Sequence, residues 1–179
     1  MKLIHEYKQH RKELAALFES AFSDSEGHDE GRIIGKLVEN LLSDTADEDI
    51  FVISALEDQA LTGSIIFTRL TFPEDDRAVF LMAPVAVATS HQGKGVGQAL
   101  IAEGLRALRE REVDAVMTYG DINYYGKSGF RVVSEDVARA PLPLSYPEGW
   151  LGQSLTGEAF RPLAGSSRCV SAFNDPAYW

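Results

Sequence analysis

Cysteine is nearly absent from this 179-residue sequence, and long apolar runs are missing altogether. The one cysteine, Cys169, has no partner within the chain, so the fold cannot rest on an internal disulfide. The first residues, MKLIHEYKQHRKEL, lack the apolar stretch of a secretory signal peptide, which favours a reducing cytoplasm. The richest apolar segment, Val79 to Thr89, is shorter than the roughly 20 residues that cross a bilayer, so we expect no membrane span.

Positive charge is also scarce. Lysine and arginine together number 17 against 27 aspartates and glutamates, which gives a net charge of -10. This balance disfavours nucleic-acid binding, which depends on basic side chains meeting phosphates. An acidic surface suits a cationic small molecule or a basic partner, although solubility alone also explains it. His5, His10 and His91 do not form metal-ligand spacing with Cys169 or the carboxylates, and we expect no metal.

The hydrophobic periodicity predicts an α/β fold. Apolar residues recur at helical spacing over 14–22 and again over 33–42, and the polar stretch 23–29 is expected to be an acidic loop. A hairpin over 50–70 is followed by an almost unbroken apolar strand over 78–87, which indicates the middle of a sheet. Further along, we predict a glycine loop, a helix from 95, a strand over 113–119, a helical turn at 124–130, a strand at 131–134 and a tail strand near 150–155.

The strand, glycine loop, helix and next strand form a unit whose two strands are expected to be parallel or nearly so. No internal repeat, low-complexity segment or second core is visible in the sequence. We therefore predict one domain over 1–179, with a core of about 1–137 and a C-terminal extension of 138–179.

The stretch from Val85 to Leu100 carries the strongest chemical signal, because a strand runs directly into a glycine-rich turn that opens a helix. Backbone N–H groups at a helix N-terminus have no partner within the helix, and the positive end of the dipole favours an anion there. Glycines allow unusual dihedral angles and close approach of the main chain to phosphate oxygens. Lys94 adds a positive charge, so Gln92–Gly97 is predicted to hold a pyrophosphate.

Two other phosphate motifs fit less well. Gly93, Gly95 and Gly97 are spaced G-x-G-x-G, whereas the dinucleotide-binding fingerprint needs G-x-G-x-x-G after a first strand. Gly126-Lys127-Ser128 imitates the end of a Walker A loop, but the earlier glycine of that motif would fall on Asp121. The sequence therefore supports neither a Rossmann domain nor an ATPase.

A hydrophobic-x-Val strand followed by Q/R-x-x-G-x-G/A resembles the acyl-CoA signature of the GNAT superfamily, and Val85, Val87, Gln92, Gly95 and Gly97 match it. The resemblance implies a mixed, mostly antiparallel sheet of six to seven strands with a splayed central pair, flanked by about four helices. It also implies that acetyl-CoA is the cosubstrate. In this reading the strand segment Val85, Ala86 and Val87 offers backbone groups to the pantetheine arm, and the amides of Gln92, Gly93, Lys94, Gly95, Val96 and Gly97 bind the pyrophosphate.

A second match lies downstream, where Tyr125 to Phe130 resembles the Tyr-x-x-x-Gly-Phe element of the same family. The family often uses this tyrosine as the general acid, so Tyr125 is the candidate proton donor and a cofactor contact. The asparagine that usually stands about six residues earlier is replaced by Tyr119. Asn123, two residues before Tyr125, is the remaining candidate amide for the cofactor.

The resemblance implies direct attack of a primary amine on acetyl-CoA in a ternary complex, with a small-molecule or peptide amine as acceptor. An alkylammonium group has a pKa of about 10.4 and must lose its proton first, so a base is required. Glu26, His28 and Glu30 lie where the family often builds its acceptor site, although His28 also fits an exposed loop histidine. A backbone N–H near Val85 would stabilise the oxyanion.

An alternative remains open at this point, namely a non-catalytic acyl-CoA-binding or regulatory module of the same fold. The missing asparagine and the unassigned base both permit it. For either reading we expect a cytoplasmic monomer or homodimer that binds neither nucleic acid nor membrane.

Overall fold

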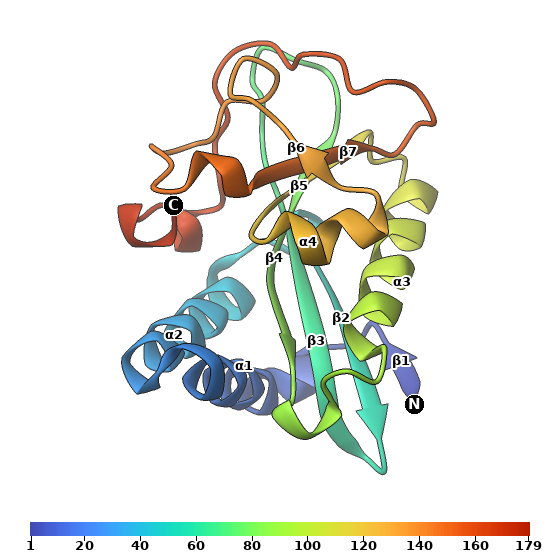
Figure 1. Ribbon diagram of the computed structural model, residues 1–179, viewed down its shortest axis with the longest axis vertical. Coiled ribbons are helices and arrows are strands. Elements are labelled where there is room, and N and C mark those ends of the chain that lie inside the picture. Colours follow the sequence, from blue (N-terminus) through green and yellow to red (C-terminus); the bar gives the residue numbers. More distant parts are fainter. The chain divides into compact units, whose positions relative to one another are not determined.

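The computed structural model describes residues 1–179 (Figure 1). None of its helices combines the length and the apolar character that crossing a bilayer requires. The strands are β1 Lys2–Ile4, β2 Ile50–Glu57, β3 Ala60–Arg69, β4 Val79–Val87, β5 Ala115–Tyr119, β6 Arg131–Val132 and β7 Trp150–Ser154, and the α-helices are α1 Arg11–Glu26, α2 His28–Asp44, α3 Val96–Glu110 and α4 Ile122–Tyr125. Short 3-10 helices include η3 Thr89–His91, η4 Gly126–Ser128 and η5 Pro147–Gly149.

The seven strands form one sheet in the order β1-β2-β3-β4-β5-β7-β6. The β1/β2, β5/β7 and β6/β7 pairs are antiparallel, whereas β4 and β5 are parallel, as the strand–helix–strand pattern predicted. The parallel pairing joins Val79–Leu81 to Ala115–Met117, although β4 continues to Val87. This short pairing agrees with the predicted splay of the central strands, and the predicted fold class is confirmed.

The chain divides into two compact units, and the first comprises residues 1–67 and 84–104. Figure 1 shows α1 and α2 side by side in this unit. The β2/β3 hairpin turns at Asp58 and Gln59, whose φ angles of 50° and 66° match the right-handed twist of a tight hairpin. The start of α3 packs directly on β3, because a methyl group on Gly63 would lie 3.0 Å from the Val96 and Leu100 side chains.

The joint between α1 and α2 differs from the sequence-based expectation. The predicted acidic loop over 23–29 is wrong, because α1 continues to Glu26, α2 begins at His28, and Gly27 alone interrupts the helices with φ 100°. Exposed serine, aspartate and glutamate side chains are tolerated in a helix whose opposite face is buried. Asp29 and Glu30 lie in the first turn of α2, where their charge interacts favourably with the helix dipole.

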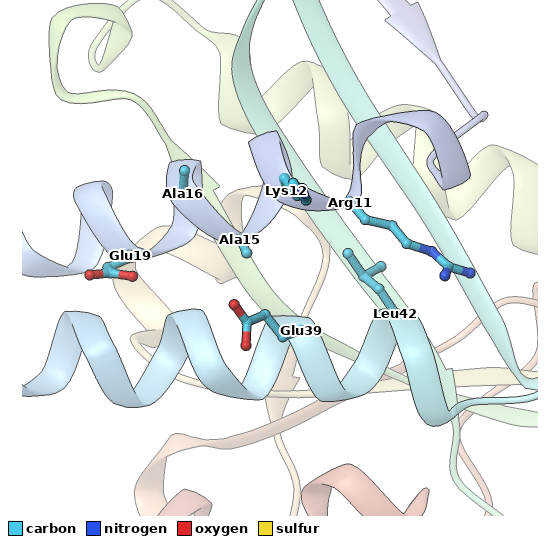
Figure 2. Close-up of a pocket in the computed structure, with 7 residues that line it drawn as sticks. All are labelled: Arg11, Lys12, Ala15, Ala16, Glu19, Glu39 and Leu42. Carbon is cyan, nitrogen blue, oxygen red and sulfur yellow. The ribbon is translucent and has the colours of Figure 1, made fainter.

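The two N-terminal helices approach closely along a pair of glycines on α2. A methyl group on Gly31 would lie 2.6 Å from the Glu19 carbonyl oxygen, and one on Gly35 would lie 2.9 Å from a Glu19 carboxylate oxygen. A cavity of about 400 Å³ opens beside this contact, and Figure 2 shows the Glu19 and Glu39 carboxylates lying in the space between the helices. Its lining residues are Arg11, Lys12, Ala15, Ala16, Glu19, Glu39 and Leu42.

The second unit comprises residues 68–83 and 105–179. The tail beyond Val137 is integrated into this unit, because Leu163 N–H donates to the Val137 carbonyl and Thr71 pairs with Arg168 through two backbone hydrogen bonds of 2.8 and 2.9 Å. The single-domain organisation stays a prediction. So does its division at residue 137 into a core and a C-terminal extension.

Asp75 joins the connection between β3 and β4 to the tail. Its carboxylate accepts hydrogen bonds from the backbone N–H and the guanidinium of Arg77 and from the Ala164 N–H, at 2.8 to 3.0 Å. The Arg77 guanidinium also donates to the carbonyls of Arg161 and Pro162. The hydrogen bonds from Arg77 hold the pKa of the Asp75 carboxyl well below its usual range, although its partial burial opposes this.

We expect Asp75→Asn to lower the free energy of unfolding by about 1 to 3 kcal/mol at pH 7, because a part-buried, charge-assisted network is weakened. A depressed carboxyl pKa stabilises the fold above the unfolded value of about 3.9, and this stability is lost as the pH falls toward the folded value. The difference from wild type should therefore stay constant from pH 7 to about pH 5 and narrow below about pH 4 in urea unfolding. Asp76→Asn, an exposed neighbour without a hydrogen bond or ion pair, is the matched control.

Candidate functional site

The connection from β4 to α3 is held by hydrogen bonds on both sides. At its start, the Ala88 N–H donates to the Thr62 carbonyl at 2.9 Å, and the Gln92 side-chain amide donates back to the Val87 carbonyl at 3.2 Å. The Thr89 hydroxyl donates to the Asp24 carboxylate of α1 at 2.6 Å. The turn that follows therefore leaves the strand in a defined direction, and it lies beside the C-terminal end of α1.

Gly93 and Gly95 shape the turn itself. Their φ angles are 72° and 82°, in the left-handed region that other residues rarely adopt. Both glycines are exposed, and a methyl group on either would meet no atom within 4 Å. Glycine is thus required here by the backbone conformation, and the space outside the turn is open to a ligand.

The first turn of α3 contains backbone donors that no group of the protein accepts. Val96 and Gly97 are themselves buried, whereas the turn before them, 92–95, is exposed. The first hydrogen bond of the helix runs from the Ala99 N–H to the Gly95 carbonyl at 3.0 Å, so the N–H groups of Val96 and Gly97 have no acceptor within the helix. The exposed Lys94 adds its charge beside them. An anion near this turn would meet several N–H donors, the positive end of the helix dipole and an ammonium group.

The end of β4 presents backbone groups away from β3. The Val87 carbonyl and the Ala88 N–H belong to one trans peptide, in which the two groups point in opposite directions. Because the Ala88 N–H donates to Thr62 of β3, the Val87 carbonyl points away from β3. Alternation along a strand places the Val85 carbonyl on the same side, while the Ala86 side chain is buried. The carbonyls of Val85 and Val87 are therefore not used in pairing with β3, and the predicted contact of this segment with the pantetheine arm stays a prediction.

A β-bulge accompanies this orientation. Leu70 N–H bonds to the Val79 carbonyl at one end of the β3/β4 pair, and Ala88 N–H bonds to the Thr62 carbonyl at the other. Between these two bonds the chain advances nine residues from Val79 to Ala88 but only eight from Thr62 to Leu70. The β4 side therefore contains one extra residue.

Tyr125 is the last residue of α4. The Asp121 carboxylate caps the N-terminus of this helix by accepting a hydrogen bond from the Asn123 N–H at 2.9 Å. The Tyr125 ring contacts the edges of Tyr124 and Phe130 at centroid distances of 5.1 and 6.0 Å. Burial raises the pKa of the phenol well above its ordinary value, and Tyr124 adds to the increase. The hydroxyl makes no hydrogen bond to the protein, so its proton has no acceptor within the chain.

The remaining predicted residues have less defined roles. Asn123 is exposed, and its backbone, not its side chain, makes a hydrogen bond. Glu26 and His28 are exposed at the helix joint, Glu30 is half-buried, and none of the three makes an ion pair or a side-chain hydrogen bond. Sequence reasoning missed the bond between Asp24 and Thr89, because no motif links residues so far apart along the chain.

Comparison with known proteins identifies the family. A model of the acetyltransferase (GNAT) family matches residues 11–130, about two-thirds of the chain. The chain therefore belongs to the GNAT acetyltransferases, and the predicted resemblance is confirmed. It is 34% identical over 139 residues to the uncharacterized N-acetyltransferase YjhQ of Escherichia coli K12, a match that covers 75% of this chain and 76% of that protein.

Solved structures show the same fold. The GNAT family N-acetyltransferase YhbS of Escherichia coli, solved in complex with CoA, has a TM-score of 0.83 at 24% identity, and the match covers 97% of this chain and 92% of that one. A GNAT family acetyltransferase of Brucella melitensis, solved with acetyl-CoA, has a TM-score of 0.71 at 23% identity and 97% coverage of both chains.

Proposed function

We propose that this acetyltransferase transfers the acetyl group of acetyl-CoA to a primary amine by direct attack in a ternary complex. The observation that carries the proposal is the start of α3, where an exposed turn with two left-handed glycines leads into backbone N–H groups that have no acceptor within the helix. A diphosphate satisfies these donors and the helix dipole together. A cytoplasmic monomer or homodimer remains our expectation for the working protein.

The backbone of the β4–α3 segment supplies the cofactor contacts. The amides from Gln92 to Gly97 bind the diphosphate, and the Lys94 ammonium adds an ionic contact. The Gln92 side chain is engaged with the Val87 carbonyl, so its role is to fix the turn and not to reach the ligand. The backbone of Val85, Ala86 and Val87 pairs with the amide groups of the pantetheine arm, as a neighbouring strand would.

The reaction requires three groups besides the cofactor site. The neutral amine attacks the thioester carbonyl, and a backbone N–H near Val85 stabilises the oxyanion that forms on the carbonyl oxygen. When the carbon–sulfur bond breaks, Tyr125 donates its phenolic proton to the departing thiolate. A phenol keeps its proton at neutral pH, the raised pKa of Tyr125 extends this to higher pH, and no group of the protein accepts the proton.

The acceptor must also lose a proton before it can attack. Glu26 and His28 are our candidates for this role, since they lie two and four residues beyond Asp24, whose carboxylate binds Thr89 at the cofactor loop. The net charge of -10 favours an acceptor that is cationic in solution.

Release of free CoA thiol from acetyl-CoA, measured against a panel of polyamines, aminoglycosides, lysine and peptide N-termini, tests the proposed activity. We expect at least one amine to raise the rate above the slow hydrolysis by water, with a linear dependence on enzyme concentration. A protein that binds acetyl-CoA in calorimetry but gives no amine-dependent release would instead be a binding module.

Gly95→Ala should weaken acetyl-CoA binding by about tenfold or more, because a side chain at φ 82° forces the turn to rearrange and moves the diphosphate donors. Gly157→Ala is the matched control, since Gly157 has φ 81° and an equally open surrounding. Both variants should lose similar stability in thermal unfolding. Equal cofactor affinity of the two variants in calorimetry would contradict the assigned binding loop.

Tyr125→Phe should lower kcat by about 100-fold or more with little change in the KM for acetyl-CoA, because a proton donor acts in the transition state. The raised pKa adds a test with a defined sign. Since Tyr125 keeps its proton well above pH 7, wild-type kcat should not fall between pH 7 and about pH 10 through loss of this proton. A proportional loss of kcat and cofactor affinity in Tyr125→Phe would indicate a structural tyrosine.

Glu26→Gln and His28→Asn test the assignment of the base. If either side chain accepts the amine proton, its variant should lower kcat/KM for the amine by about 10- to 100-fold near pH 7 and lose less at high pH, where the free amine is abundant. Glu19→Gln, at an exposed glutamate of α1, the helix that ends at Glu26, serves as the control. Unchanged activity in both variants would leave water or the substrate itself as the proton acceptor.

A further inference from the structure

Tyr125 is placed through its ring, because its hydroxyl has no partner in the protein. The closest approach is to Gly120, the residue after β5: a methyl group there would lie 2.7 Å from Cε2 and 3.4 Å from Cδ2 of the Tyr125 ring. Gly120 does not have a positive φ, so close approach and not backbone conformation explains the glycine. The Gly120 backbone is therefore the surface against which the phenol ring rests.

The tail holds Gly120 in turn. The Gly120 N–H donates to the Gly149 carbonyl at 2.9 Å. Gly149 is buried and lies close to Tyr146 and Gly120. A methyl group on Gly149 would lie 2.6 Å from Cδ1 of Tyr146 and 3.1 Å from the Gly120 carbonyl oxygen. The segment from Tyr146 to Gly149 thus packs directly on the backbone that supports Tyr125.

Tyr119 fixes this tail segment to the end of β5. Its hydroxyl accepts the Tyr146 backbone N–H at 2.6 Å and lies 3.4 Å from the Ser145 hydroxyl. The Tyr119 ring is stacked on Trp179 and meets the edge of the fully buried Trp150, with both centroid distances at 6.3 Å. The tyrosine that replaces the expected asparagine therefore makes a tail contact that an asparagine at this position is too short to make.

We infer that the tail segment 145–149, anchored by the Tyr119 hydroxyl, positions Tyr125 for proton transfer through the backbone of Gly120. Tyr119 and Gly120 are positioning residues, because they act on the reaction through Tyr125. This inference rests on the proposed function, in which Tyr125 protonates the departing thiolate.

Gly120→Ala is the first test, with CoA-thiol release measured for the most active amine, or for water if no amine is active. The added methyl displaces the ring, so kcat should fall by about 10- to 100-fold while the KM for acetyl-CoA stays within about threefold. Gly126→Ala is the matched control: Gly126 follows Tyr125 directly, has a helical φ of -59°, and a methyl group there would make contacts of 3.5 Å or more. Its kcat should equal that of wild type.

Tyr119→Phe is a more conservative test of the tail contact, because it keeps the stacked ring and removes only the hydroxyl that accepts a hydrogen bond from the Tyr146 N–H. We expect roughly a fivefold loss of kcat, the size associated with one hydrogen bond, and an unchanged affinity for acetyl-CoA. This variant keeps the inference testable if Gly120→Ala fails to fold.

A double-mutant cycle separates positioning from general damage. If Gly120 and Tyr119 act through Tyr125, then Gly120→Ala and Tyr119→Phe should each have no further effect on kcat in the Tyr125→Phe background. Additive losses would overturn the inference, as would wild-type kcat in both single variants. If Tyr125→Phe itself leaves kcat unchanged, the proposed role of Tyr125 fails, and that outcome is distinct from a failure of the tail alone.

Discussion

The unsatisfied backbone N–H groups at the start of α3 are the constraint on which the rest of the structure depends. An exposed helix end of this kind is stable with water, but it is more favourable with an anion, and the two left-handed glycines keep it open. The surrounding contacts hold it in place: Gly63 lets α3 pack on β3, Gln92 ties the turn to β4, and Thr89 ties it to α1. Each of these contacts serves the geometry of one loop.

The second unit has a corresponding arrangement around one phenol. Partial burial raises the pKa of Tyr125 above its ordinary value, and its hydroxyl makes no hydrogen bond to the protein. The tail packs beside this ring through Gly149 and Gly120. In the proposed mechanism this packing places the proton donor, and the burial of Trp150 and Trp179 shows that the C-terminal segment is integrated into the second unit.

Sequence reasoning located the glycine turn between β4 and α3, because a change from strand to helical periodicity across spaced glycines is a local signal with a physical cause. Its role as the cofactor loop stays a prediction. Sequence reasoning misplaced the joint between α1 and α2, since polar residues on an exposed helix face look the same as a loop when tertiary packing is unknown. It could not find the bonds from Asp24 to Thr89 or from Tyr119 to Tyr146. These contacts join residues 65 and 27 positions apart, and no periodicity or spacing encodes such pairs.

Amide chemical shifts of the isotopically labelled protein, followed during titration with CoA and separately with pantetheine, test the central claim most directly. Pantetheine carries the thiol arm but lacks the diphosphate. If these amides bind the diphosphate, those from Gly93 to Gly97 should show large, saturable shifts with CoA and small ones with pantetheine. Equal shifts with both ligands, or shifts that leave this turn untouched while other amides respond, would contradict it.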